Sequence, residues 1–214
     1  KIMNIDPNIY LHLTSLGDVV PLDFTIDVKK LNTELEQFKN DWKKYHPRKT
    51  VDFGREALAL TSLDGELAGI NLDSLREHNA EHNTKYREQD FDKRTPVAEK
   101  LTALHPLLDM FDTLGRSHLI KLRRGGYFPP HRDAKILDAG CYRILTMLDN
   151  CQSKDLVFLL GDQRLHMEIG RPYLVNTRKL HTVFSFTDNS VQCVLNIPLT
   201  AENYTAVVKR LKEK

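Results

Sequence analysis

Two stretches in the first half of the chain carry apolar residues at helical spacing. In 27–45 they recur every three or four positions, which predicts an amphipathic helix that packs on a flat surface. In 95–114 a Thr-Pro start supplies an N-cap and a first-turn proline, and Pro106 is expected to kink or divide the helix. Between them, 56–63 predicts a strand that ends at an Asp-Gly turn.

After Gly115 the pattern changes to short alternating or continuous apolar runs, separated by Gly, Asn and Asp, which favour turns. Seven such strands indicate an antiparallel barrel or sandwich. In 201–214 the apolar residues share one helical face among lysines, so this helix is expected to pack on the outside or against another subunit. The predicted strands are 117–122, 142–148, 156–160, 164–169, 172–175, 181–186 and 191–197.

The segment 71–94 is rich in charged and amide side chains and holds few core-forming residues. Long polar connections in compact domains often cover a functional site, so we expect a lid here. The alternative is a solvated helix and loop without a role. The expected organisation is one domain over 1–214, with helical and strand support in 1–116, a β core in 117–198 and a C-terminal helix in 199–214.

Composition and charge indicate a globular protein. Hydrophobic residues make up 41% and charged residues 28% of the 214 residues, which excludes general disorder. The net charge of +2 gives no support to nucleic-acid or membrane binding. No apolar stretch approaches the roughly 20 residues that cross a bilayer, and the first residues lack a signal-peptide pattern. We therefore expect a cytoplasmic protein whose three cysteines are reduced.

A histidine–aspartate pair and a later histidine are candidate metal ligands. His131 and Asp133 are two residues apart, so in an extended chain both side chains lie on one face. Taken alone, such a pair is commonly a surface pair. His181 opens the penultimate predicted strand, far enough along for the intervening strands to bring it back to the pair. Two imidazoles and one carboxylate are the ligand set of non-haem iron(II) oxygenases, with positions left open for co-substrate and oxygen.

Three ordered motifs resemble a known family. The stretch 118–198 is similar to the double-stranded β-helix core of the iron(II)- and 2-oxoglutarate-dependent oxygenases, most of all to the aspartyl/asparaginyl β-hydroxylase group, which includes proline hydroxylases. This resemblance implies an α+β fold with a mainly β, jelly-roll or cupin-like core, supported by N-terminal helices and a C-terminal helix. The motifs are the glycine-containing run into His131-Arg132-Asp133, the strand Tyr142-Arg143-Ile144-Leu145, and Gly170-Arg171-Pro172-Tyr173-Leu174-Val175-Asn176 leading to His181-Thr182-Val183.

The resemblance also implies a chemistry. Iron(II) would bind His131, Asp133 and His181, 2-oxoglutarate would chelate the iron, and O₂ would take the remaining position. The expected reaction hydroxylates a C–H bond of an amino acid, free or within a peptide or protein, with succinate and CO₂ as co-products. In such enzymes the cofactor carries the difficult chemistry, while the protein positions the reactants and excludes competitors.

The residue that would anchor the distal carboxylate of 2-oxoglutarate departs from the family pattern. A basic residue usually follows the second histidine by about one hairpin, but Gln192 stands there, with no arginine nearby. A buried carboxylate needs a charge-assisted partner, preferably arginine. Arg143 is the best candidate because the family carries an arginine in this strand, although the usual Arg-x-His continuation lacks its histidine. Lys121, Arg123 and Arg178 are backups with a solvated charge as the alternative, and Gln192 can add a neutral hydrogen bond.

Other functions stay open. His166-Met167-Glu168 is a second His-x-acid pair, so a cupin-type metal enzyme that does not use 2-oxoglutarate is one alternative. A nucleic-acid-directed oxygenase and a non-catalytic β-barrel binding module are two others. Substrate selectivity is expected in 71–94 and 56–63, and Arg55 or Arg94 are candidates to pair with a substrate carboxylate. The C-terminal helix is the candidate interface of an oligomer whose size the sequence leaves open.

Overall fold

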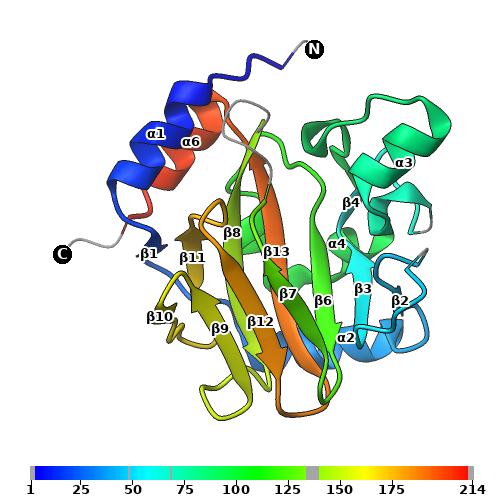
Figure 1. Cartoon of the computed structure of the whole chain (residues 1–214). Helices are drawn as coiled ribbons and strands as arrows, with labels where there is room; N and C mark the ends of the chain where they lie inside the picture. The colour runs from blue at the N-terminus through cyan, green and yellow to red at the C-terminus, as the bar shows by residue number, and fades with distance from the viewer. Residues whose placement is uncertain (1–2, 48, 68, 134–139, 212–214) are drawn as a thin grey trace.

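Two antiparallel sheets pack face to face in the computed structural model, which describes residues 3–47, 49–67, 69–133 and 140–211 (Figure 1). The larger sheet has the strand order β1 (Val19–Pro21), β11 (Pro172–Val175), β8 (Cys141–Asp149), β13 (Ser190–Pro198), β6 (His118–Leu122), β3 (Arg55–Ala59) and β2 (Lys43–Lys44). The smaller has the order β10 (Gln163–Arg164), β9 (Leu156–Leu160), β12 (His181–Ser185) and β7 (Tyr127–His131). A separate pair is formed by β4 (Thr61–Ser62) and β5 (Lys93–Arg94).

From β6 to β13 the chain alternates between the two sheets. β6, β8, β11 and β13 belong to the larger sheet, while β7, β9 and β12 belong to the smaller one, with β10 added as a hairpin to β9. This alternation makes the core a double-stranded β-helix. The α+β fold class predicted from the sequence is therefore confirmed.

Two apolar cores lie on the two faces of the larger sheet. Along β8, Tyr142 and Ile144 belong to the outer core, and Leu145 and Met147 belong to the core between the sheets. Successive side chains of a strand point to opposite faces, so a strand buried on both faces is almost continuously apolar. This explains why β8 and β13 are mostly apolar in sequence without a strict alternation, and it places Arg143 on the inner face with Leu145.

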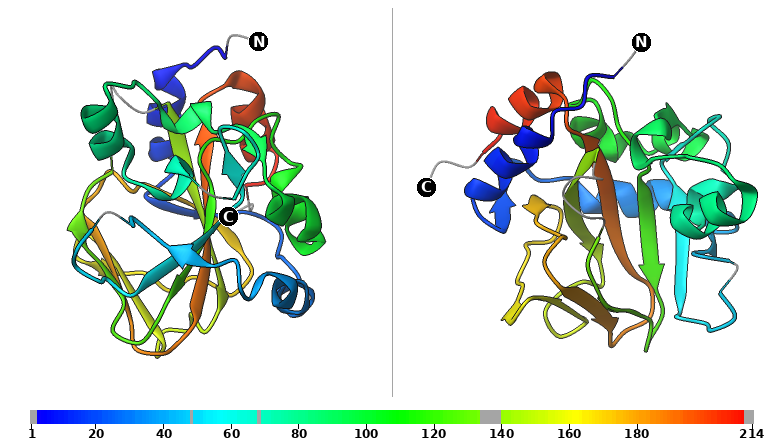
Figure 2. Two further views of the ribbon diagram at one scale, coloured as in Figure 1. Left: turned by 90° about the vertical axis from the view of Figure 1, so that its right-hand side faces the viewer. Right: turned by 45° about the horizontal axis from the view of Figure 1, so that its top comes forward.

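Five helices cover the outer face of the larger sheet, and α1 lies beside α6 (Figures 1 and 2). Four of them begin at a side-chain cap, where Asp6, Asp27, Thr95 or Thr200 accepts a hydrogen bond from a backbone N–H of the first turn. None of the described helices is long and apolar enough to cross a bilayer. The five are α1 (Pro7–Ser15), α2 (Val28–Leu35), α4 (Pro96–Lys100), α5 (His105–Leu108) and α6 (Ala201–Val208).

The two helices predicted in the first half of the chain are shorter than expected. The prediction of one helix over 27–45 is wrong: α2 passes into a 3₁₀ turn, η1 (Glu36–Phe38), and the chain then joins the sheet as β2. Trp42 packs against the outer core and Tyr45 enters the inner one, so their apolar character reflects two environments rather than one helical face. In 95–114 the division falls at Leu101, whose ψ of 74° ends α4 before η4 (Thr102–Leu104) and α5.

Most predicted strands agree with the structure within one or two residues, and 56–63 and 164–169 are the exceptions. The strand predicted over 56–63 is divided into β3 of the larger sheet and β4, which pairs with β5. β10 ends at Arg164 because the chain beyond Leu165 leaves β9, although Leu165, Met167 and Ile169 still pack against the inner core. The helix predicted over 201–214 ends at Val208, and Leu211 bridges to Leu22. Residues 212–214 lie outside the described part of the chain.

The polar segment 71–94 folds as short helices held by buried polar contacts. The segment is made of η2 (Ile70–Leu72), α3 (Leu75–His82) and η3 (Glu88–Asp90), followed by β5. Arg116 donates to the carbonyl oxygen of Asp73 at 2.6 Å, and Phe91 is fully buried. That the segment 71–94 covers a site stays a prediction. Its buried contacts attach it firmly to the rest of the fold.

Candidate metal centre

The side chains of His131, Asp133 and His181 converge at one end of the smaller sheet. His131 ends β7 and His181 begins β12, where the two residues are cross-strand partners with ring centroids 4.2 Å apart. Asp133 follows His131 by two residues, and its Oδ1 lies 3.7 Å from His131 Nε2. One ligand atom from each residue lies within 4.8 Å of the other two, a grouping that can hold a metal ion.

Both imidazoles are fixed in the tautomer that a metal ligand needs. His131 Nδ1 lies 2.7 Å from the carbonyl oxygen of Pro129, and His181 Nδ1 lies 3.0 Å from that of Lys179. A carbonyl oxygen only accepts, so Nδ1 carries a proton in both rings, and Nε2 is the ring nitrogen left available to a metal. Such bonds to the outer nitrogen are the usual support of metal-binding histidines. The donor set and its support therefore fit a divalent transition metal.

The local sequence explains how β7 brings His131 to this position. Pro129 and Pro130 lack the N–H that a central strand requires, and β7 lies at the edge of its sheet, where its partner among the described strands is β12. On the paired side, Thr182 donates its hydroxyl to the carbonyl oxygen of Phe128 at 2.6 Å. Because successive residues of a strand turn their N–H groups to opposite sides, one of the two prolines faces β12, and the register of β7 and β12 shifts at this point, between His181 and Val183. The Pro129 carbonyl lies near the His131 ring.

Asp133 is held as a carboxylate. Burial raises its pKa, but the Arg143 guanidinium, a side-chain hydrogen bond from Thr177 and the two histidines outweigh this and lower the pKa below its ordinary value. Arg143 Nε lies 3.0 Å from Asp133 Oδ2, and the Asp133 N–H donates to the carbonyl oxygen of Thr177. The carboxylate is therefore anionic at neutral pH and fixed at both its side chain and its backbone.

Burial lowers the pKa of His181, and the Asp133 carboxylate offsets only part of this effect. The side chain is 5% exposed, so protonation would bury a second charge beside the site. His181 is consequently neutral at neutral pH, which is the form that binds a metal.

Arg143 and its neighbours form a polar wall behind the metal ligands. Arg116 is 5% exposed and makes a two-pronged ion pair with Glu88, through Nε at 2.8 Å and Nη2 at 3.0 Å. Asn196, the cross-strand partner of Arg143, donates to Glu88 Oε2 and to the carbonyl oxygen of Arg116. This network ties 71–94 to β13 close to Arg143.

The predicted co-substrate residues differ in where they lie. Arg143 contacts Asp133, and Gln192 lies on the inner face opposite Met147, farther along β13. Lys121 lies on the outer face, where it pairs with Glu56 at 2.7 Å. Arg123 is largely exposed and pairs with Asp52. Neither of these last two side chains reaches the inner face beside the metal ligands.

Arg178 interacts electrostatically with Asp133, and its guanidinium packs on an aromatic ring that the sequence patterns did not predict. Its guanidinium carbon sits 3.4 Å from the ring centroid of Tyr10 in α1, and the Tyr10 hydroxyl donates to Asn176. The helix that carries Tyr10 was missed. Its N-cap Asp6 and first-turn Pro7 are a recognisable helix start and were the available signal.

The second His-x-acid pair does not join the site. His166 Nδ1 bonds to the Ser153 hydroxyl at 2.8 Å on the surface, and Glu168 is exposed and paired with Arg171. The metal-binding group found among the described residues contains His131, Asp133 and His181 and neither member of this pair.

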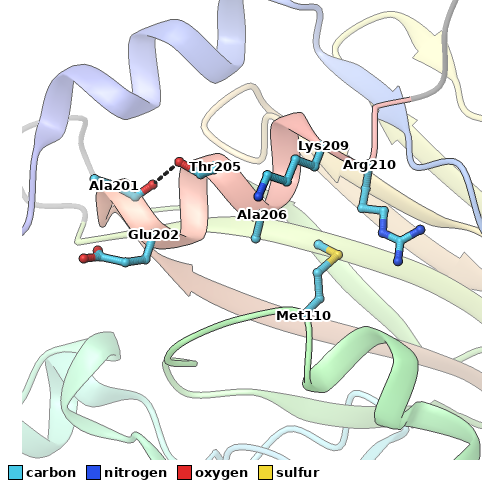
Figure 3. Close-up of a pocket in the computed structure, with 7 residues that line it drawn as sticks. All are labelled: Met110, Ala201, Glu202, Thr205, Ala206, Lys209 and Arg210. Atoms are coloured by element: carbon cyan, nitrogen blue, oxygen red, sulfur yellow. Dashed lines mark hydrogen bonds between the residues drawn. The ribbon is translucent and has the colours of Figure 1, made fainter.

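A surface cavity of about 510 Å³ lies between α6 and Met110. Figure 3 shows the Met110 side chain facing Ala206 and Lys209 of α6, with Arg210 at one end. Its lining includes neither the metal ligands nor any residue of the wall behind them.

Comparison with known proteins gives a likeness of fold. No family model matches the sequence, and no curated protein matches it. A prolyl-4-hydroxylase from Pseudomonas putida is similar over 90% of this chain and 98% of its own, at 9% identity and a TM-score of 0.49. KdgF from Halomonas sp. is similar over 73% of this chain and 84% of its own, at 11% identity and a TM-score of 0.36. A salicylate 1,2-dioxygenase from Pseudaminobacter salicylatoxidans is similar over 37% of this chain and 20% of its own, at 9% identity and a TM-score of 0.29.

Proposed function

We propose that the protein is an iron(II)- and 2-oxoglutarate-dependent oxygenase that hydroxylates a C–H bond of an amino acid, free or within a peptide or protein. The observation that carries this proposal is the grouping of His131, Asp133 and His181, in which one ligand atom of each residue lies within 4.8 Å of the other two, while both Nδ1 atoms are engaged by backbone carbonyls. Two histidines and one carboxylate leave open positions on an octahedral ion, which an oxygenase needs for co-substrate and oxygen.

The residues of the chain have separable roles in this proposal. His131, Asp133 and His181 hold the metal, and the backbone carbonyls of Pro129 and Lys179 fix the two rings. Arg143 keeps the Asp133 carboxylate ionised and oriented. When bound, iron(II) with 2-oxoglutarate supplies the activation of oxygen. The double-stranded β-helix supplies a rigid site, since its ligands stand on or beside paired strands.

Metal-dependent turnover of 2-oxoglutarate tests the proposal. Purified protein loaded with iron(II) should form succinate from 2-oxoglutarate, and a chelator should abolish this formation. Asp133→Ala and His181→Ala should each lose metal binding in calorimetry as well as turnover. His166→Ala removes a surface histidine and is the matched control, so both properties should be retained. Iron-loaded protein that does not bind 2-oxoglutarate contradicts the proposal.

A cupin-type metal enzyme without 2-oxoglutarate is the second candidate. Two observations favour it: Gln192 stands where a basic residue is expected, and Arg143 is engaged with Asp133. The same calorimetry separates the two functions. Tight metal binding by the His131 site together with no affinity for 2-oxoglutarate would favour the cupin-type enzyme.

A further inference from the structure

Arg55 places a cation inside the β-helix. It opens β3 on the inner face of the larger sheet and is 8% exposed. Its guanidinium carbon lies 4.5 Å from the ring centroid of Phe53, 4.4 Å from that of Phe128 and 5.8 Å from that of Tyr45. Aromatic faces attract a guanidinium and hold its plane, but they do not accept its N–H bonds as a carboxylate does.

The guanidinium of Arg55 lacks the acidic partner that comparable arginines have. Arg116 pairs with Glu88 and Arg143 with Asp133, whereas no carboxylate of a described residue lies within ion-pair distance of Arg55. Its buried Nε has no hydrogen-bond partner within the described ranges. A buried charge without a counter-ion is costly, and burial lowers the pKa of Arg55. Such a group is stabilised when an anion binds to it.

Close backbone contacts beside Arg55 hold the start of β3 in place. Gly54, with φ +66°, packs against Gly126 in the turn between β6 and β7, and a Cβ on Gly126 would lie 2.6 Å from the Gly54 carbonyl oxygen. The Tyr127 N–H donates to the carbonyl oxygen of Phe53 at 3.0 Å. These contacts bring the start of β3 close to β7, so Arg55 is held beside Phe128 by two chain segments.

Phe128 connects Arg55 with the metal ligands. It precedes His131 by three residues on β7, and the two ring centroids are 6.2 Å apart. The Arg55 guanidinium carbon lies 4.4 Å from the Phe128 centroid, so its distance from the His131 ring cannot exceed the sum of these two distances. This upper bound brings Arg55 within the reach of an elongated diacid held at the metal ligands.

We propose that Arg55 is the carboxylate anchor of the site and binds an acidic group of the molecule held in front of His131, Asp133 and His181. The inference rests on the proposed oxygenase function. A planar guanidinium between aromatic rings offers two parallel N–H donors to a carboxylate and rejects the corresponding neutral amide. The carboxylate comes either from 2-oxoglutarate, as its distal group, or from an amino-acid substrate, and the test distinguishes these sources.

The first arm of the test measures binding of 2-oxo acids to the protein loaded with Mn²⁺, by calorimetry without turnover. 2-Oxoglutarate is compared with 2-oxopentanoate, which has the same carbon chain and no distal carboxylate. If Arg55 anchors the co-substrate, the wild type should bind 2-oxoglutarate at least about tenfold more tightly, and Arg55→Gln should remove this preference. Arg55→Lys keeps the charge without the two-pronged geometry and should retain part of the preference for 2-oxoglutarate.

The second arm measures binding of free L-amino acids and their amides to the same Mn²⁺-loaded proteins. If Arg55 anchors the substrate, Arg55→Gln should leave 2-oxoglutarate binding unchanged and remove the preference for the acid over the amide. Arg123→Gln removes a neighbouring exposed arginine and should change neither preference. Far-ultraviolet circular dichroism and Mn²⁺ affinity, equal in all variants, verify that the fold and the metal ligands are intact.

The outcomes separate the two proposals. Failure of the wild type to bind 2-oxoglutarate at all overturns the oxygenase function. Equal binding of every acid by wild type, Arg55→Gln and Arg55→Lys, including no binding by any of them, overturns the anchor. Arg55 would then be a packing residue between Phe53 and Phe128.

Discussion

His118 lies in β6 with 2% of its surface exposed, and its Nε2 donates to the carbonyl oxygen of Asn71 at 2.5 Å. Burial, followed by the nearby positive charge of Arg116, lowers its pKa from 6.5 to about 3, although the bond to Asn71 opposes this. An unfolded chain returns the imidazole to its ordinary value. Below pH 6.5 the unfolded state therefore binds a proton that the folded state excludes.

The sign and size of the effect follow from proton linkage. The stabilising contribution of neutral His118 is complete above pH 6.5 and is lost as the pH falls toward about 3. Once the imidazole of the unfolded chain is fully protonated, each further pH unit lowers the free energy of unfolding by about 1.4 kcal/mol. A change from pH 6.5, where that imidazole is half protonated, to about pH 4.5 removes about 2.3 kcal/mol. His46, whose pKa is lowered to about 4, adds a similar slope over most of the same range.

The variant His118→Gln isolates one of the two histidines, because glutamine can donate to the Asn71 carbonyl and does not titrate. Urea unfolding of wild type and variant at several pH values gives the free energy of unfolding for each. The variant should lose about 1.4 kcal/mol less per pH unit than the wild type between about pH 6 and pH 4.5. Parallel slopes would refute the reasoning and mean that the His118 environment admits a proton in the folded state.

Three further changes test other contacts. Gly126→Ala places a Cβ 2.6 Å from the Gly54 carbonyl oxygen and should lower the free energy of unfolding by about 1–3 kcal/mol; an unchanged urea midpoint would contradict the close packing of these segments. Glu88→Gln leaves buried Arg116 without its counter-charge and should cost about 3 kcal/mol or more in the same assay, while Glu202→Gln on exposed α6 should cost little. Arg143→Gln removes the cation that holds Asp133 and should weaken Mn²⁺ binding about tenfold or more in calorimetry. Arg164→Gln, on β10, is its control, and equal affinities in the two variants would show that Asp133 needs no cationic support.

The β core was predictable because its sequence signals are local. Turn residues bound each apolar run, and the two-residue spacing of His131 and Asp133 fixes their common face once the chain is extended. His181 is the first residue of the predicted strand 181–186, and the position of this strand in the order of strands identified the third ligand. The grouping of these three side chains agrees with that prediction in geometry, and their binding of a metal stays a proposal.

The errors come from residues whose environment is decided by distant parts of the chain. Trp42 and Tyr45 continue the helical spacing of 27–45, yet β2 pairs with β3 and sends them into different cores. Hydrophobic periodicity predicts that a residue is buried, but it does not predict which surface of the fold the residue packs against. Polar residues of 71–94 are a parallel case, because Asn71 and Asp73 are buried by contacts with Arg116 and His118 that lie more than 40 positions away.

Arg55 shows the same limitation at the site itself. The sequence offers Arg55, together with Arg94, as a candidate to pair with a substrate carboxylate, and the missing basic residue near Gln192 directs the search for the co-substrate anchor to β8 and β13 rather than to β3. In the structure Arg143 is occupied by Asp133, whereas Arg55 is buried among aromatic rings beside Phe128. A candidate acid-binding arginine is recognised by having no acidic partner in the folded chain, and only the packing of the described residues shows whether a partner is there. If the anchor lies in β3, a strand outside the alternating β-helix core supplies recognition while the core supplies the metal, and the two functions can vary independently.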